Sequence, residues 1–148
     1  MQRCGPAVVG LKHAERGLGA RLTGTEPESP LIAVVDDDAS FREAMTDILH
    51  FWGFGVEPFE SAEAVLASRD LGRYDAFLLD VQMPGLSGLQ LLERLRKEKV
   101  AAPVILVTSC NDAATRKQAA KGGALALFGK PFNADELMGL LRQALSAA

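Results

Sequence analysis

Acidic, hydroxyl and ammonium side chains stand directly after short apolar runs in this sequence, and together their types suit phosphate chemistry. They are the triplet Asp36-Asp37-Asp38, the single Asp80, Thr108 and Lys130. A carboxylate can attack phosphorus and form an acyl phosphate, while a hydroxyl and an ammonium group hold the phosphoryl oxygens. Closely spaced carboxylates also offer the hard oxygen ligands that Mg²⁺ prefers. If the fold brings these side chains together, the sequence predicts a phosphoryl-transfer site.

Several carboxylates at one place repel one another, and their pKa values rise unless a cation compensates the charge. The competing interpretation is that acidic residues at strand ends only cap the helices that follow. We expect that role for Asp38, as the N-cap residue of the first helix. For Asp36, Asp37 and Asp80 together, a Mg²⁺ site is the better interpretation of the pattern.

From residue 31 onward, apolar runs alternate with helical periodicities, and these elements must position the polar groups. Strands are predicted at 31–35, 54–59, 76–79, 103–107 and 125–128. Helices are predicted over 41–52, 61–69, 89–95 and 113–121, and from Asn133 toward Leu145. The inward residues of the last two helices are expected to be Ala113, Ala114, Ala119 and Ala120, and then Leu137, Leu140, Leu141 and Leu145.

Five short strands joined by helices must run parallel, with right-handed crossovers. The sequence therefore predicts an α/β fold, a doubly wound five-stranded parallel sheet with helices on both faces. The expected strand order is 2-1-3-4-5, as in flavodoxin-like folds. In such a sheet the functional site lies at the carboxyl ends of the strands, where the polar residues stand.

The 148 residues suffice for one domain and carry a formal net charge of −3. We expect residues 1–30 to be a flexible or loosely packed extension, and residues 31–148 to form the domain. The acidic balance offers no broad basic surface for nucleic acid, and no apolar run is long enough to span a membrane. Cys4 and Cys110 lack metal-ligand spacing and are interpreted as free thiols, which favours a cytoplasmic protein.

Four segments, in this order and spacing, resemble the receiver domain of bacterial two-component response regulators. They are Val34-Val35-Asp36-Asp37-Asp38, Leu79-Asp80-Val81-Gln82-Met83-Pro84-Gly85-Leu86-Ser87-Gly88, Val107-Thr108 and Gly129-Lys130-Pro131-Phe132. The resemblance covers residues 31 to about 147, and it is closest to receivers of nitrogen-fixation and nodulation transcription regulators.

The resemblance implies a phosphoacceptor in a two-component phosphorelay, and not an enzyme beyond its own phosphorylation and dephosphorylation. Asp80 would take a phosphoryl group from a sensor histidine kinase or a histidine phosphotransfer protein. Asp37, Asp80 and the backbone carbonyl of Gln82 would bind Mg²⁺ directly, with Asp36 assisting through water. Thr108 and Lys130 would contact the phosphoryl oxygens, and the Lys130-Pro131 bond would be cis.

Some positions depart from the usual pattern of the family. The residue three before the lysine, commonly aromatic, is Leu127 here, and Ser109, Cys110 and Asn111 replace the more usual loop residues. These departures bear on the switch that follows phosphorylation and leave the phosphoacceptor unchanged. The sequence also has no room for a DNA-binding output domain after the last helix, so we expect no nucleic-acid partner, a monomer or weak dimer, and a downstream protein target.

Two other classes share parts of the pattern. A haloacid-dehalogenase-like phosphatase would use Asp36-Asp37-Asp38 as its nucleophile loop, but it needs a later acidic pair at a strand end. Here only Asp135 and Glu136 follow Lys130, inside a predicted helix. A flavodoxin-type flavin module would have to hold a phosphate in the first loop, where three aspartates repel an anion. A receiver-like module that binds its partner without phosphorylation remains a third interpretation.

Overall fold

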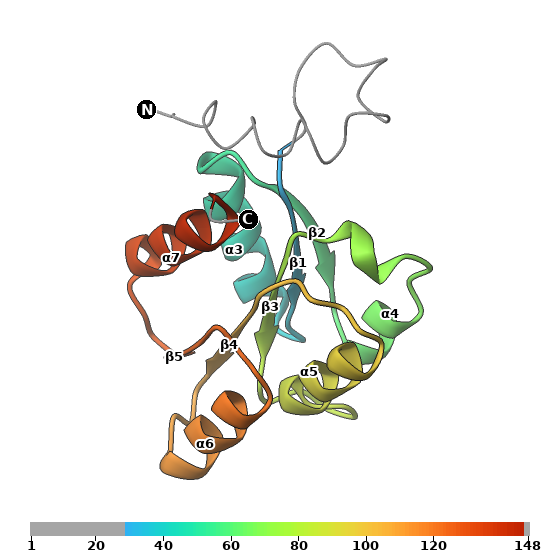
Figure 1. Ribbon diagram of the computed structural model, residues 1–148. Helices are drawn as coiled ribbons and strands as arrows, with labels where there is room; N and C mark the ends of the chain where they lie inside the picture. Colours follow the sequence, from blue (N-terminus) through green and yellow to red (C-terminus); the bar gives the residue numbers. More distant parts are fainter. Residues whose placement is uncertain (1–28, 147–148) are drawn as a thin grey trace.

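The computed structural model describes residues 29–146, drawn as ribbon in Figure 1. Residues 1–28 of the predicted extension, and Cys4 with them, lie outside the described residues. The strands are β1 (Leu31–Val35), β2 (Gly55–Phe59), β3 (Ala76–Asp80), β4 (Val104–Thr108) and β5 (Ala126–Gly129). The helices are α3 (Ala39–Phe51), α4 (Ala62–Leu66), α5 (Gly88–Lys97), α6 (Ala113–Lys121) and α7 (Ala134–Ser146), with a short 3₁₀ helix at Leu71–Arg73.

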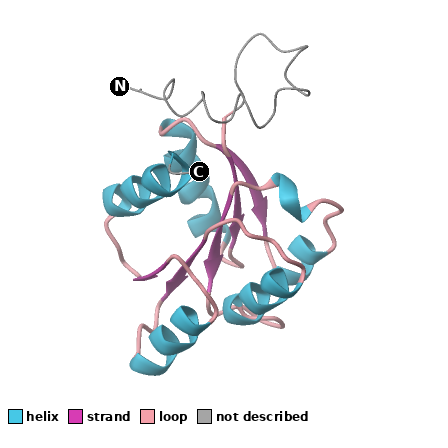
Figure 2. Ribbon diagram, viewed as in Figure 1, coloured by secondary structure: helices cyan, strands magenta, loops and turns pink. Residues whose placement is uncertain are grey.

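The five strands form one parallel sheet in the order β2-β1-β3-β4-β5, which confirms the predicted topology (Figure 2). The central strands β1, β3 and β4 are almost entirely apolar because both of their faces are covered. The edge strand β2 accommodates Pro58, which has no N–H to donate to a second neighbour.

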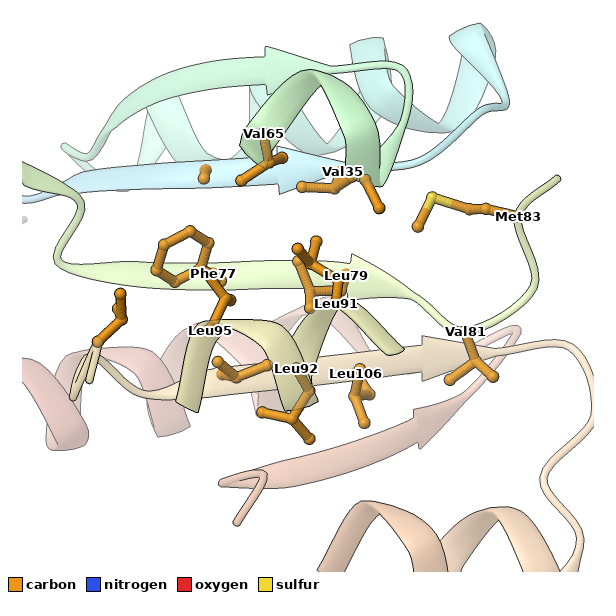
Figure 3. Close-up of a cluster of buried hydrophobic side chains, with 14 of the residues drawn as sticks. Val35, Val65, Phe77, Leu79, Val81, Met83, Leu91, Leu92, Leu95 and Leu106 are labelled. Atoms are coloured by element: carbon orange, nitrogen blue, oxygen red, sulfur yellow. The ribbon is translucent and has the colours of Figure 1, made fainter. Parts of the chain in front are cut away.

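Alternate residues of each strand pack into two separate cores, one on each face of the sheet. On one face, Phe77, Leu79 and Leu106 pack against α4, α5 and α6 (Figure 3). On the other face, Ile32, Leu78 and Ile105 pack against α3 and α7. The result is the predicted three-layer arrangement. Among the described residues, no helix is long and apolar enough to cross a membrane.

Three helices end with the same hydrogen-bonded turn. In α3, α5 and α6 the chain turns back through a residue of positive φ, and the next N–H donates to a carbonyl of the last helical turn. Gly53 and Gly123 supply this conformation in α3 and α6, at φ of 93° and 83°. In α5 the position is occupied by Lys99, at φ 63°. A side chain is strained there, because only glycine adopts positive φ without steric cost.

The inward residues of two helices differ from the prediction. In α6 only Ala119 is buried, while Ala113, Ala114 and Ala120 are exposed. A helix of alanines, lysines and glutamine has no broad apolar stripe, so the sequence did not determine which side faces the sheet. In α7 Met138 is buried and Leu140 is only partly buried, so the apolar stripe is rotated relative to the predicted one.

The strand and helix bounds also shift by a few residues. Asp80 and Thr108 are the last residues of β3 and β4, where the prediction ended the strands one residue earlier. The helix predicted over 61–69 is shorter, since Ser61 is its N-cap and Ala67 its C-cap. Because Asp80 and Thr108 belong to the strands, their backbone is fixed within the sheet.

Candidate functional site

Three carboxylates converge at the carboxyl edge of the sheet. Asp36 follows β1 and is 1% exposed, while Asp80 ends β3 and is 5% exposed. Asp37 is exposed to solvent beside them. One carboxylate oxygen from each of the three residues lies within 4.8 Å of the others. Asp38 points elsewhere and caps α3, accepting from the N–H groups of Ser40 and Phe41, as predicted.

Lys130 reaches this cluster from the end of β5. Its Nζ lies 3.1 Å from an Asp36 oxygen and 3.7 Å from an Asp80 oxygen. The Lys130 N–H donates to the carbonyl of Thr108 at 2.7 Å, which holds this loop against β4, and the bond to Pro131 is cis as predicted. The ammonium group also lies 4.1 Å from the ring centroid of Phe41. This cation–π contact orients the lysine toward the carboxylates.

The environment of Asp80 raises its pKa to about 6. Burial is the largest cause, and the neighbouring charges of Asp36 and Asp37 act in the same direction. Lys130 and the backbone N–H of Gln82, which donates to Asp80 at 3.2 Å, oppose the rise. The site therefore carries more negative charge than its single lysine balances.

Thr108 is fully buried at the end of β4, and its hydroxyl contacts three polar groups of Gln82 and Cys110. The side-chain oxygen of Gln82 accepts from the hydroxyl at 2.9 Å and from the N–H of Ser109 at 3.2 Å. The N–H of Cys110 donates to the same hydroxyl at 3.0 Å. Because the Ser109 N–H can only donate, the amide oxygen of Gln82 must face β4, and the Thr108 hydroxyl has this oxygen at 2.9 Å and the Cys110 carbonyl at 3.2 Å as acceptors.

Two further residues shape the loop that follows Asp80. A side-chain carbon added to Gly88 would lie 2.3 Å from the backbone oxygen of Asp80, so the start of α5 packs directly on the backbone of this aspartate. Glu63 of α4 accepts from the N–H of Leu86 at 3.1 Å, next to Gly85 at φ 77°. These contacts fix the loop from Val81 to Ser87 from both sides.

The structure brings all the predicted side chains to one edge, and it adds contacts that the sequence did not reveal. Asp36, Asp37, Asp80 and Lys130 form one cluster, and Thr108 lies beside it on the neighbouring strand. Gln82 was predicted to act through its carbonyl, whereas the structure adds a side-chain contact to Thr108. Phe41 begins the helix predicted over 41–52, and the sequence gave no signal for its contact with Lys130. The Gly88 contact was also missed.

Chemically, the cluster combines two buried carboxylates, one exposed carboxylate and an ammonium group. The oxygen donors of Asp36, Asp37 and Asp80 fit Mg²⁺, which takes carboxylates and water in octahedral geometry. A divalent cation would also relieve the repulsion that raises the pKa of Asp80.

Comparison with known proteins is consistent with this geometry. The family model for the response regulator receiver domain matches residues 32–142. The chain is 34% identical over 117 residues to the transcriptional regulatory protein FixJ of Bradyrhizobium diazoefficiens, covering 79% of this chain and 57% of that relative. It is 31% identical over 143 residues to the response regulator protein TodT of Pseudomonas putida, covering 97% and 58%. The chain thus spans a little over half the length of these relatives.

Solved structures show the same likeness. A CheY-like receiver domain protein from Methanospirillum hungatei superimposes with a TM-score of 0.76 at 28% identity, covering 81% of this chain and 96% of that one. The FixJ-N crystal structure gives 0.73 at 30% identity, covering 82% and 97%. The alternative of a haloacid-dehalogenase-like phosphatase finds no support in these matches. Moreover, Asp135 and Glu136 lie in the first turn of α7 and not at a strand end.

Proposed function

This chain belongs to the response regulator receiver domain family of two-component systems, and we propose that it carries its phosphoryl group on Asp80. The observation that supports this assignment is the position of Asp80. It is the one aspartate of the cluster that ends a central strand, and it lies within reach of two other carboxylates and of Lys130.

The chemistry follows from the groups around Asp80. A carboxylate oxygen attacks the phosphorus of a phosphohistidine, the phosphorus–nitrogen bond breaks, and the imidazole leaves with its electron pair and takes up a proton. The product is an acyl phosphate on Asp80. Lys130 moves from its contact with Asp36 toward the new phosphoryl oxygens, where its charge is needed more.

Asp36, Asp37, Asp80 and the carbonyl of Gln82 would hold Mg²⁺, Asp36 through water. When bound, Mg²⁺ neutralises charge on the transferred group and lowers the repulsion between donor and acceptor. Asp37 is the exposed carboxylate of the set, so it is suited to a cation that must enter from solvent together with a phosphorylated partner.

Thr108 couples the phosphorylation of Asp80 to movement in the rest of the domain. A phosphoryl group brings about two negative charges and new acceptor oxygens to Asp80. The Thr108 hydroxyl then exchanges its bond to Gln82 for a bond to a phosphoryl oxygen, and the loop from Ser109 to Asp112 follows. Leu127 has no ring to rotate, so the movement passes to α6 and not to β5.

Receiver domains of response regulators act with histidine kinases or phosphotransfer proteins, and they serve in signalling. We propose the same partners here: a phosphohistidine donor upstream and a protein target downstream. The chain would catalyse only its own phosphorylation and dephosphorylation, in the cytoplasm. Both FixJ and TodT are longer than the matched region, which covers 57% and 58% of their lengths.

The test is phosphorylation with a small acyl phosphate, with and without Mg²⁺, read by intact mass and peptide mapping. We expect one phosphoryl group per chain, on Asp80, and only with Mg²⁺ present. Asp80→Asn removes the nucleophile with little change of shape, and it should take up none. Asp47→Asn is the matched control, because Asp47 is an exposed aspartate on α3 away from the site. Label on another residue of the Asp80 variant would contradict the assignment.

A further inference from the structure

The charges of the domain are unevenly distributed. Residues 88–121, which contain α5 and α6, carry seven lysines and arginines and only three acids, a net charge of +4. The remainder of residues 31–148 carries five against thirteen, a net charge of −8. An acidic domain with one basic region has a local electrostatic field that attracts anionic groups to that region.

A groove of about 910 Å³ runs between α5 and α6 in this basic region. Figure 1 shows these two helices as neighbours, and Figure 3 shows Leu92 of α5, which contributes to the core and to the groove. The half-buried Leu89 gives the groove an apolar floor above the buried Leu92, while Lys97 and Lys121 stand on its rim. Gly122 completes the floor, since a side-chain carbon there would lie 2.8 Å from Leu92.

Glu93 also lines the groove, so Arg96, Lys97 and Lys121 leave it a net charge of +2, and among the described residues no ion pair joins these cations to an acid. The ion pairs found within residues 29–146 use the cations Arg73 and Lys130. Arg96 of the groove donates only to backbone oxygens, those of Val100, Ala102 and Gly123. Lys97 and Lys121 are exposed. The charges of the groove therefore remain available to an external anion.

The shape and composition favour a protein segment over a nucleic acid. A groove with an apolar floor and a polar rim is the usual anatomy of a protein interface. A nucleic acid gains most of its affinity from many phosphate contacts, and this groove offers few cations while the rest of the domain repels a polyanion. A peptide helix with leucines on one face and glutamates beside them matches both parts of the groove.

We propose that the α5–α6 groove is a docking surface for an acidic, amphipathic segment of a partner protein. Apolar side chains of that segment pack on Leu89, and its carboxylates pair with Lys97 and Lys121. This surface is distinct from the carboxylate cluster, and the proposal does not depend on which aspartate is phosphorylated.

The test is a chemical-shift titration of the isotope-labelled 148-residue chain, in its unphosphorylated form, with a short synthetic peptide of leucines and glutamates at helical spacing. We expect salt-sensitive shifts confined to residues of α5 and α6 that face the groove. A peptide with glutamines in place of glutamates should not bind. Lys121→Glu should weaken binding about three- to tenfold, the loss expected when a surface ion pair becomes a repulsion.

Lys117→Glu is the matched control, because it makes the same charge change on α6 outside the groove. It should change the affinity less than about twofold. Equal losses in the two variants, absence of binding, or shifts centred elsewhere would overturn the proposal. So would tighter binding of a single-stranded oligonucleotide to the groove, or the same shifts arising from self-association of the chain without peptide.

Discussion

We expect the ionised Asp80 to destabilise the folded domain. The substitution Asp80→Asn measures this effect as a change in the free energy of unfolding. The pKa of Asp80 rises from 3.8 in the unfolded chain to about 6 in the native state. The ionised carboxylate is therefore less stable in the native state than in the unfolded chain. That difference corresponds to about 3 kcal/mol at neutral pH. Asparagine removes the charge and keeps the shape, so in metal-free solution the variant should gain up to roughly 3 kcal/mol in free energy of unfolding.

The stability gained by Asp80→Asn must increase as the pH rises. Because the native pKa of Asp80 is raised, the native state holds its proton to higher pH than the unfolded state does. The wild-type domain therefore loses stability as pH rises from about 4 to 6, and the loss is complete above that range. Urea unfolding at pH 4, 5, 6 and 7.5 in the presence of a chelator should show the two proteins converging at low pH, separating between about pH 4 and 6, and differing most at pH 7.5.

Asp47→Asn provides the control for loss of a surface carboxylate, and its effect should stay within about 0.5 kcal/mol at every pH. Mg²⁺ should stabilise the wild type and narrow its difference from Asp80→Asn, because the cation binds the charged cluster. A pH-independent gain, or a variant less stable than the wild type at pH 7.5, would refute this account of the cluster.

Four further outcomes follow from the site and the helix ends. Asp37→Ala should weaken Mg²⁺ binding at least about tenfold by calorimetry, and raise metal-free stability by about 1 kcal/mol, since it relieves repulsion. Gly88→Ala should cost about 1–3 kcal/mol and slow phosphorylation, because its new carbon meets the backbone oxygen of Asp80. Lys99→Gly should stabilise the domain by about 0.5–1 kcal/mol in urea unfolding, as it relieves a positive φ. Methyl spectra with and without beryllofluoride should show the Ser109–Asp112 loop and α6 moving while Leu127 keeps its rotamer; a Leu127 rotamer change, or unchanged α6 amides, would contradict this.

The topology could be predicted from the sequence because buried strands consist of apolar residues. Strands such as β1 and β4 are covered on both faces, so they appear as continuous apolar runs ended by polar residues. Helix α5 begins with a capping box of Ser87 and Gln90, a pattern that is visible in the sequence itself. Helix α6 has no distinct apolar face, because alanines bury little surface in any orientation. Three of its four predicted inward residues are therefore exposed.

The candidate site was predictable to the level of residue identity and no further. Carboxyl ends of parallel strands share an edge, which is sufficient to place Asp36, Asp80 and Thr108 together. Orientation depends on contacts between loops, and these have no periodic signature. The bond between Gln82 and Thr108 joins residues 26 positions apart, and the stacking of Lys130 on Phe41 joins the two ends of the domain.

The geometry of the loops also links the proposed phosphorylation site to the proposed docking groove. Helix α5 begins at Gly88 against the backbone of Asp80, and Ser87 at its N-cap lines the groove. Helix α6 begins directly after the loop that Thr108 anchors through Cys110. The two walls of the groove thus start from the two loops that a phosphoryl group on Asp80 would pull together.

With only Ala119 buried, α6 has little packing to resist such a movement, whereas α5 is fixed by Leu91, Leu92 and Leu95. Phosphorylation should therefore alter the width of the groove mainly by displacing α6, so that the affinity for an acidic partner differs between the two states.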